Sequence, residues 1–193
     1  MRICVMTTHA WYWRSCNASA RMQTVEQRIG FIIRGVVQQA MRDSGRSTLR
    51  LIGEETPEAQ LIERWCGQRF SRDAASLTVS SFSKTSLLLA GVDQPVDLSP
   101  LGDLYASDIT HFCRCRLSGS AAEFANAAGG AEILDDCLRK LLDERRDADA
   151  AFAAAPQIRE PLLRRLEQTR FRRARAGIIP KIGARTIGID LFI

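Results

Sequence analysis

The sequence lacks any uncharged apolar stretch close to the roughly 18 residues that a membrane-spanning helix needs, which excludes an integral membrane protein. Its 13 glycines and six prolines are too few for a low-complexity or collagen-like chain of 193 residues. The six cysteines show no framework spacing, and a chain of this length buries a core without disulfides. Only a short apolar run follows Arg2, too short for a signal-peptide core. These absences predict one soluble domain in the reducing cytoplasm.

The formal net charge of +5, from 27 basic and 22 acidic residues, is unevenly placed. Residues 159–185 hold nine basic side chains against two acidic ones, a net +7, whereas the remainder, with 18 basic and 20 acidic residues, has a net −2. A basic end on a mildly acidic body predicts an anionic partner. Nucleic acid is the weaker candidate, because base stacking needs interleaved aromatic side chains and Phe171 is the only aromatic residue in the segment.

Periodicity and capping residues predict helices alternating with short strands. One helix begins at the capping box of Thr24 and Gln27 and stops at Gly45, and another begins at the N-cap Thr56, followed by Pro57. The other expected elements are strands at 49–52 and 77–79, helices at 85–90, 103–117 and 133–142, a basic helix from residue 161, and an extended end at 177–193. This alternation predicts an α/β fold dominated by helices.

A polar turn, residues 80–83, follows the strand expected at 77–79 and precedes a helix. An α/β protein binds ligands at such a junction, so the turn is a candidate ligand site.

Residues 111–115 (HFCRC) could hold a metal ion or pack as part of a helix. The spacing matches no strong zinc pattern, no second pair of ligands completes a set of four, and the neighbouring arginines would repel a cation. Packing is the favoured interpretation, because free cysteines are commonly buried as small apolar side chains.

Three segments carry a resemblance to a known family. Residues 77–89 read LTVSSFSKTSLLL, residues 96–105 read VDLSPLGDLY, and residues 170–182 read RFRRARAGIIPKI. They resemble, in this order, a strand with its Gly-Thr-Gly-Asn-Lys-Thr-Glu-Leu turn, the motif Asp-Ile-Asn-Pro-Ile-Gly-Asp-Leu-Tyr-Lys, and the closing Glu-Tyr-Lys-Arg-Arg-Gln-Ala-Pro-Pro-Gly-Leu-Lys-Val of NAD⁺ synthases, which are N-type ATP pyrophosphatases. We expect residues 51–193 to be the carboxyl-terminal part of a synthase-like domain, and residues 1–50 to be an unassigned segment with one amphipathic helix.

The resemblance implies an incomplete Rossmann-like adenine-nucleotide hydrolase fold and the ATP-dependent amidation of deamido-NAD⁺ to NAD⁺. ATP adenylates the substrate carboxylate, pyrophosphate leaves, and ammonia displaces AMP. The implied cofactors are ATP and Mg²⁺, the substrates are deamido-NAD⁺ and ammonia, and the family usually acts as a homodimer. Carried over residue by residue, the nucleotide- and substrate-binding positions are Ser81, Ser83, Lys84, Asp103, Arg172, Arg173 and Lys181.

The sequence also departs from the family at positions that bear on activity. The Ser-Gly-Gly-x-Asp-Ser pyrophosphate loop, whose backbone N–H groups cradle phosphates, is absent. Ser86 stands in place of the magnesium-binding glutamate, and Ala106 in place of the lysine after Leu-Tyr. We therefore expect either a synthase-type ligase with an incomplete chain, or a catalytically inactive relative that binds a nucleotide or acts through protein contacts.

The carried-over residues also have structural interpretations. Asp103 can cap the helix expected at 103–117, and Ser81 and Ser83 can form hydrogen bonds within their turn. The arginines can belong to a solvated helix face. These alternatives stay open at the level of sequence.

Overall fold

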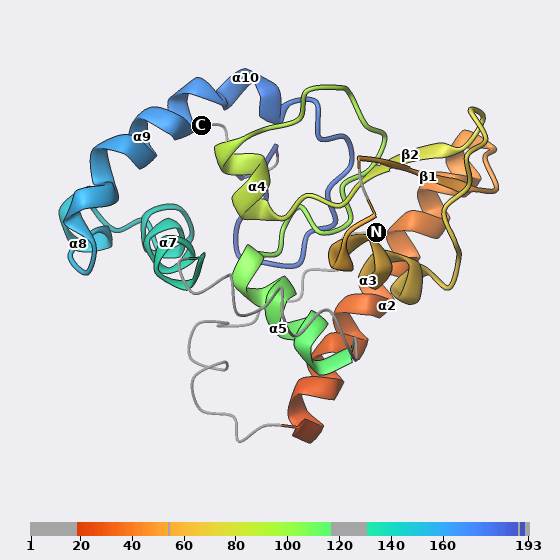
Figure 1. The fold of residues 1–193 in the computed structure, drawn as a ribbon, viewed down its shortest axis with the longest axis horizontal. Coiled ribbons are helices and arrows are strands. Elements are labelled where there is room, and N and C mark those ends of the chain that lie inside the picture. Colours follow the sequence, from red (N-terminus) through yellow and green to blue (C-terminus); the bar gives the residue numbers. More distant parts are fainter. Residues whose placement is uncertain (1–18, 54, 117–130, 189, 192–193) are drawn as a thin grey trace.

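The computed structural model of the chain describes residues 19–53, 55–116, 131–188 and 190–191. Within them the protein is helix-rich, with one two-stranded parallel sheet, and is thus of the α/β type (Figure 1). No helix in these ranges is long and apolar enough to cross a membrane. The expectations for residues 1–18 and for the side chain of Cys115 fall outside the described residues.

The sheet consists of β1 (Leu49–Ile52) and β2 (Leu77–Ser80), which confirms both predicted strands. Two single parallel bridges extend the sheet beyond β2: Leu98 pairs with Val79 of β2, and Ile178 pairs with Leu98. Because these segments all run in the same direction, their carboxyl ends lie at one edge. The predicted extended end at 177–193 contributes the bridge at Ile178, a second bridge between Ile187 and Leu191, and no named strand within its described residues.

Three helices pack together on one side of the molecule: α2 (Ser19–Ser44), α3 (Pro57–Cys66) and α5 (Ala106–Arg116). The start of α3 is confirmed, because the Thr56 side chain accepts a hydrogen bond from the Ala59 N–H at 3.3 Å. The predicted capping box is wrong, because Thr24 lies within α2 and not at its start. The predicted stop at Gly45 is confirmed by its left-handed φ of +67°.

The remaining helices form an arc around α4 (Lys84–Leu89), as Figure 1 shows. They are α7 (Ala131–Leu138), the π-helix η1 (Arg139–Asp143), α8 (Ala148–Ala151), the 3₁₀-helix η2 (Pro156–Ile158), α9 (Arg159–Gln168) and α10 (Arg170–Arg173). The helix predicted at 133–142 therefore changes to π geometry in its last turn. The basic helix begins two residues before the predicted Pro161; Leu162 and Leu166 are buried on its inner face, and Leu163 is half-buried.

Two hydrophobic clusters make up the core. The first joins α2 and α3 to the strands and includes Ile33, Trp65 and Leu98. The second lies among α4, α7, η1 and α9 and includes Leu87 and Leu142. Residues on both sides of position 50 share the first cluster, so α2 packs with the rest of the chain. The thiols of Cys66, Cys113 and Cys137 are free and buried in these clusters.

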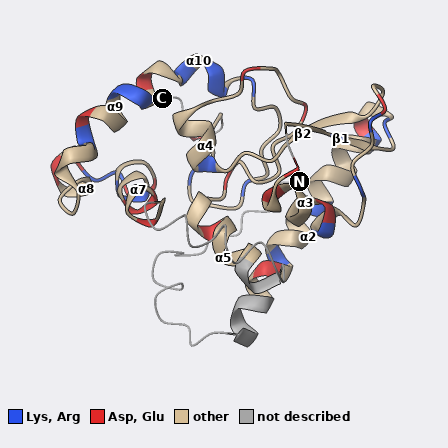
Figure 2. Cartoon of the chain, in the orientation of Figure 1, with Lys and Arg blue, Asp and Glu red and all other residues tan. Residues whose placement is uncertain are grey.

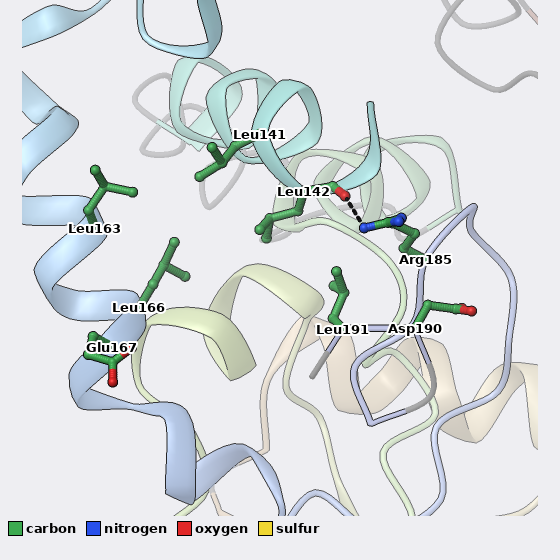
Figure 3. A pocket seen from close by; sticks show the side chains of 8 residues that line it. All are labelled: Leu141, Leu142, Leu163, Leu166, Glu167, Arg185, Asp190 and Leu191. Carbon is green, nitrogen blue, oxygen red and sulfur yellow. Dashed lines mark hydrogen bonds between the residues drawn. The ribbon is translucent and has the colours of Figure 1, made fainter. Parts of the chain in front are cut away.

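Lys and Arg residues follow α9 and α10 along the outer rim of the molecule (Figure 2). Beneath this rim, α9, η1 and residues near Arg185 and Leu191 line an open pocket of about 590 Å³ (Figure 3). Its lining residues are Leu141, Leu142, Leu163, Leu166, Glu167, Arg185, Asp190 and Leu191.

Candidate functional site

The candidate site lies at the carboxyl edge of the parallel segments. β2 runs directly into the polar turn and α4, while the segment at Leu98 runs into Ser99. The hydroxyls of Ser80 and Ser99 are 2.7 Å apart in a buried hydrogen bond, and the Ser99 hydroxyl also donates to the Ala176 carbonyl. This contact holds two neighbouring strand ends together at the edge where α/β proteins bind ligands.

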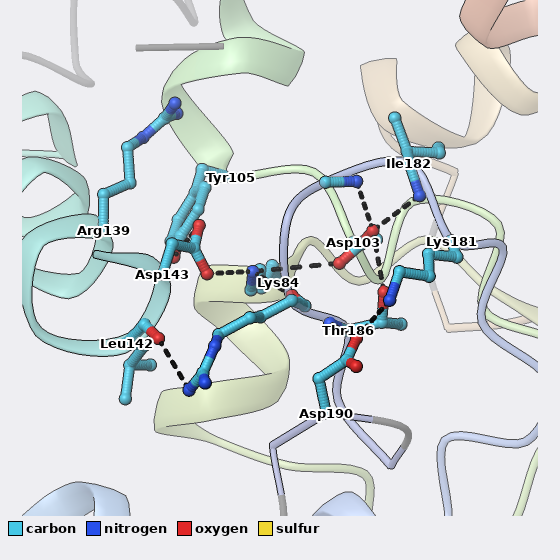
Figure 4. A network of polar contacts seen from close by, with 12 residues as sticks. Lys84, Asp103, Tyr105, Arg139, Leu142, Asp143, Lys181, Ile182, Thr186 and Asp190 are labelled. Atoms are coloured by element: carbon cyan, nitrogen blue, oxygen red, sulfur yellow. Dashed lines mark hydrogen bonds and ion pairs between the residues drawn. The ribbon is translucent and has the colours of Figure 1, made fainter. Parts of the chain in front are cut away.

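Lys84, the first residue of α4, is the centre of a buried ionic network (Figure 4). Its side chain is 0% exposed, and its Nζ donates to Asp143 Oδ1 at 2.9 Å and to the Arg185 carbonyl at 2.5 Å. The same Nζ lies 3.8 Å from Asp103 Oδ1 and 4.8 Å from the centre of the Tyr105 ring. The lysine carried over by resemblance is thus enclosed by protein groups.

Asp103 fastens this network to a segment about 80 positions further along the chain. Its Oδ2 accepts hydrogen bonds from the backbone N–H groups of Ile182 and Gly183, at 2.6 and 2.5 Å, and from the Thr186 hydroxyl at 3.0 Å. Its buried Oδ1 has no hydrogen-bond partner. Burial raises the pKa of Asp103 above its ordinary value, against the opposing effect of the Lys84 charge and the three donors.

Asp103 does not cap a helix, which makes the capping interpretation wrong. The helix expected at 103–117 begins at Ala106, and the carboxylate that meets its first turn is Asp108, which accepts from the Tyr105 N–H. A second carboxylate, that of Asp135, accepts from the Ser107 N–H at 2.7 Å. Asp103 instead accepts hydrogen bonds from residues 182–186.

Sequence reasoning missed Asp143, Tyr105 and Arg139. The Tyr105 hydroxyl donates to Asp143 Oδ2 at 3.1 Å, so the two oxygens of Asp143 hold the lysine and the tyrosine. Arg139 stacks 4.4 Å from the Tyr105 ring centre and pairs with Asp108 at 2.8 Å. Burial and the Asp143 charge raise the pKa of Tyr105, which keeps its hydroxyl protonated as a donor. The one sequence signal was Tyr105 itself, inside the resembling segment 96–105.

Ser83 caps α4, as the structural interpretation of the turn predicts. Its hydroxyl accepts from the Ser86 N–H at 3.1 Å and lies 3.0 Å from the Ser86 hydroxyl. Ser81 is half-buried in the same turn. Both residues therefore lie beside Lys84 in the chain, and the observed role of Ser83 is to start the helix.

The three basic residues carried over from the closing segment do not converge on Lys84. Arg173 is buried and donates to the carbonyls of Leu166 and Leu88, the latter near the opposite end of α4. Burial lowers its pKa from the ordinary value. Arg172 is exposed and pairs with Asp93 at 3.1 Å.

Lys181, also exposed, pairs with Asp190 at 2.6 Å. It borders the network because the next residue, Ile182, donates to Asp103.

Most of the basic segment has partners within the protein. Exposed members pair with nearby carboxylates, and others donate to backbone carbonyls, as Arg165 does to Leu89 and Arg175 to Asp93. The residues of the segment with such contacts are Arg159, Arg165, Arg170, Arg172, Arg173, Arg175, Lys181 and Arg185. Eight of the nine basic side chains of 159–185 therefore have a partner within this chain.

The observed arrangement does not fit Mg²⁺ or a nucleotide phosphate directly. In the described part of the chain, no three His, Cys, Asp or Glu side chains gather closely enough to hold a metal ion. Asp103 Oδ1 is a buried oxygen without a hydrogen bond, but the Lys84 ammonium 3.8 Å away would repel a cation there. Lys84 in turn has no exposed surface to offer a phosphate.

Comparison with models of protein families found none that matches this chain, and searches of curated proteins and of solved structures likewise returned no match.

Proposed function

We propose that the chain is an NAD⁺ synthase-type domain with an incomplete Rossmann-like fold, which serves the ATP-dependent amidation of deamido-NAD⁺. One observation carries the proposal: the three segments that resemble the family meet at one edge of the parallel sheet. Lys84 belongs to the first, Asp103 to the second and Ile182 to the third, and Asp103 contacts both others. Their convergence is what a shared site requires, because residues far apart in sequence act together only when the fold unites them.

The proposed reaction sets physical demands on this edge. The substrate carboxylate attacks the α-phosphorus of ATP, pyrophosphate leaves with its bond electrons, and ammonia then attacks the acyl carbon and displaces AMP. Cationic groups have to offset charge on the phosphates, and water has to be kept from the acyl-adenylate. Of the basic residues in the resembling segments, Lys84 pairs with Asp103, and Lys181 adjoins Ile182, whose N–H donates to Asp103.

A second candidate is a catalytically inactive nucleotide-binding or interaction protein. The observation that favours it is the closure of Lys84, which is fully buried between two carboxylates and a carbonyl. Ser86, at the position of the family's metal-binding glutamate, adds a hydroxyl and no negative charge. The ligase and a nucleotide-binding form of this candidate differ in turnover and share the prediction of nucleotide binding, whereas an interaction protein predicts neither.

The decisive test combines binding and turnover on the purified chain. Under the first proposal, ATP, Mg²⁺, deamido-NAD⁺ and ammonium yield AMP, pyrophosphate and NAD⁺ in equal amounts. Binding of Mg²⁺–ATP without AMP release favours the second candidate. Absence of both binding and turnover contradicts the ligase proposal and the nucleotide-binding form of its alternative, and leaves the interaction protein.

A matched pair of variants ties the result to the site. Lys181 and Lys140 are both partly exposed and each pairs with one aspartate, but only Lys181 lies in a resembling segment. We expect Lys181→Gln to weaken binding of Mg²⁺–ATP or deamido-NAD⁺ by about three- to tenfold, the usual value of one charge-assisted hydrogen bond. Lys140→Gln serves as the control and should leave binding unchanged. If the two variants weaken binding equally, the ligand does not bind at this edge of the sheet.

A further inference from the structure

The open pocket between η1, α9 and the residues near Arg185 is lined mainly by leucines (Figure 3). Leucines make up five of its eight lining residues, and its volume is about 590 Å³. Protein interiors contain few voids larger than a water molecule, whereas pockets of several hundred cubic ångströms are typical of small-molecule sites. The pocket is therefore large enough to hold a small organic ligand.

The leucines form a fixed floor and two accessible walls. Leu142, Leu166 and Leu191 are buried members of the second hydrophobic cluster, so packing sets their positions. Leu141 and Leu163 pack against the same cluster but are only half-buried, so each leaves apolar surface beside the pocket. Covering such surface with an apolar group removes it from water, which is favourable. The lining thus favours a ligand with an apolar part.

Arg185 is the basic residue of this lining. Its backbone carbonyl accepts from Lys84 Nζ at 2.5 Å, which fixes the point from which the half-buried side chain extends. A guanidinium has five N–H donors, and Nη1 of Arg185 makes a long hydrogen bond of 3.3 Å to the Leu142 carbonyl. Within the described ranges no carboxylate lies at ion-pair distance from Arg185. Its charge and most of its donors are therefore available to an anion in the pocket.

The two acidic residues of the lining already have cationic partners. Asp190 pairs with Lys181 at 2.6 Å, and Glu167 lies 3.8 Å from Arg170. An ammonium ligand would meet the uncompensated charge of Arg185. A polyphosphate also fits poorly, because one guanidinium balances one negative charge and two carboxylates share the lining. A single carboxylate fits best, since its two oxygens can accept parallel hydrogen bonds from one guanidinium.

We propose that this pocket binds a small aliphatic monocarboxylate, with the carboxylate at Arg185 and the alkyl chain against the leucines of η1 and α9. The ligand uses none of the buried charges of the Lys84 network. The inference goes beyond the proposed function and does not rest on it, because neither ATP nor deamido-NAD⁺ takes part. Octanoate is the probe.

The first experiment is titration calorimetry of the purified chain with hexanoate, octanoate and decanoate. We expect one ligand to bind per chain, and the affinity to rise about two- to fourfold with each added methylene, as burial of an alkyl chain predicts. Octylammonium has the same alkyl chain and the opposite charge, so it should bind at least about tenfold more weakly than octanoate. Absence of saturable octanoate binding up to about 1 mM overturns the proposal. Equal binding of octylammonium overturns it as well.

A matched pair of variants tests the role of the guanidinium. Arg185→Gln removes the charge and keeps an amide that can donate, and it should weaken octanoate binding by about tenfold or more, the usual effect of a charge-assisted hydrogen bond. Arg146 pairs with Glu144 at 2.7 Å and does not line the pocket, so Arg146→Gln should leave octanoate binding unchanged. Urea unfolding of both variants checks that the fold is kept. Unchanged binding by a folded Arg185→Gln variant contradicts the assignment.

A second pair tests the apolar wall. Leu163→Trp places a larger side chain in the pocket from a half-buried position, and we expect it to abolish octanoate binding. Ile133→Trp makes a similar change on α7 at an exposed residue outside the lining, and it should have no effect. If Leu163→Trp binds octanoate as the wild-type chain does, the ligand lies elsewhere and the proposal is overturned.

Sedimentation velocity tests the other occupant that an apolar pocket could take, a second copy of this chain. A chain that is monomeric with and without octanoate supports the small-molecule site. A dimer that Leu163→Trp dissociates, and that Ile133→Trp does not, overturns it in favour of a subunit interface.

Discussion

Replacing Lys84 with methionine is the sharpest test of whether this lysine is a structural cation. The two side chains have similar length and volume, so Lys84→Met removes the charge with little change in packing. Two carboxylates lose their partner: Asp143, bound at 2.9 Å, and Asp103, at 3.8 Å. The Asp103 side chain is 0% exposed, and water cannot replace the lost ammonium.

The size of the effect follows from this burial. Removal of one partner from a buried ion pair costs about 3–5 kcal/mol, because the remaining charge is left uncompensated in a poorly solvated place. Asp143 retains 17% side-chain exposure and so contributes less than Asp103. We expect Lys84→Met to lower the free energy of unfolding by about 3–5 kcal/mol at pH 7, a large part of the stability of a typical domain.

The assay is equilibrium unfolding in urea, with Lys140→Met as the matched control. Lys140 pairs with Asp136 one helical turn away in a partly exposed ion pair, which contributes less than about 1 kcal/mol. The pH dependence provides a second readout. Burial raises the pKa of Asp103 and Lys84 opposes this, so the variant's Asp103 pKa is higher still.

The sign of the pH effect follows from proton binding. A carboxyl whose pKa is raised by folding binds a proton in the folded state before the unfolded chain does, near pH 3.9. The deficit of Lys84→Met should therefore shrink as the pH is lowered from 7 through the raised pKa. If the variant loses less than about 1 kcal/mol and shows no such pH dependence, Lys84 is not the buried structural cation described here.

Other predictions concern the packing around the site. Gly177→Ala should lower the free energy of unfolding, measured in urea, by at least about 3 kcal/mol, because φ is +65° and a Cβ would lie 2.3 Å from a backbone oxygen. Gly45→Ala, at φ +67° with open space around the residue, should lower it by about 1 kcal/mol. Similar losses for the two would contradict the predicted clash. Trp65→Phe removes the buried 2.7 Å hydrogen bond to Glu26 and should cost about 1–3 kcal/mol, also by urea unfolding; no loss would contradict it. Burial raises the pKa of Cys66 to about 11, so iodoacetamide should modify it at pH 8 only after unfolding, and rapid native modification would refute this.

The helices and strands that were predicted correctly are those whose start or end is set by residues nearby in the sequence. Thr56 and Pro57 start α3 because capping and a preset φ act within one turn, and Gly45 ends α2 for a similarly local reason. The strands at 49–52 and 77–79 were found from short apolar runs. The start of α2 was missed because Thr24 has the composition of a cap while the residues before it continue the helix.

The roles of the site residues could not be found this way. Arg172 and Arg173 are adjacent in sequence, yet one is exposed beside Asp93 and the other is buried among carbonyls of α4 and α9. Asp103 looks like a helix cap in the sequence, and its partners are about 80 positions away. Asp143 was not predicted as a site residue, because nothing in its local sequence distinguishes it from the other charged residues of its helix.

Sequence alone determined short-range features of this protein: the segments that become helices or strands, the N-cap of α3 at Thr56, the end of α2 at Gly45, and the α/β alternation. The resemblance to NAD⁺ synthases also comes from sequence and stays a prediction. Tertiary structure alone decided that Lys84 is enclosed, that Asp103 binds residues 182–186 and that the basic segment is largely paired within the chain. The physical reason is that the state of a charged side chain depends on desolvation and on partners, and the fold supplies both from distant parts of the chain.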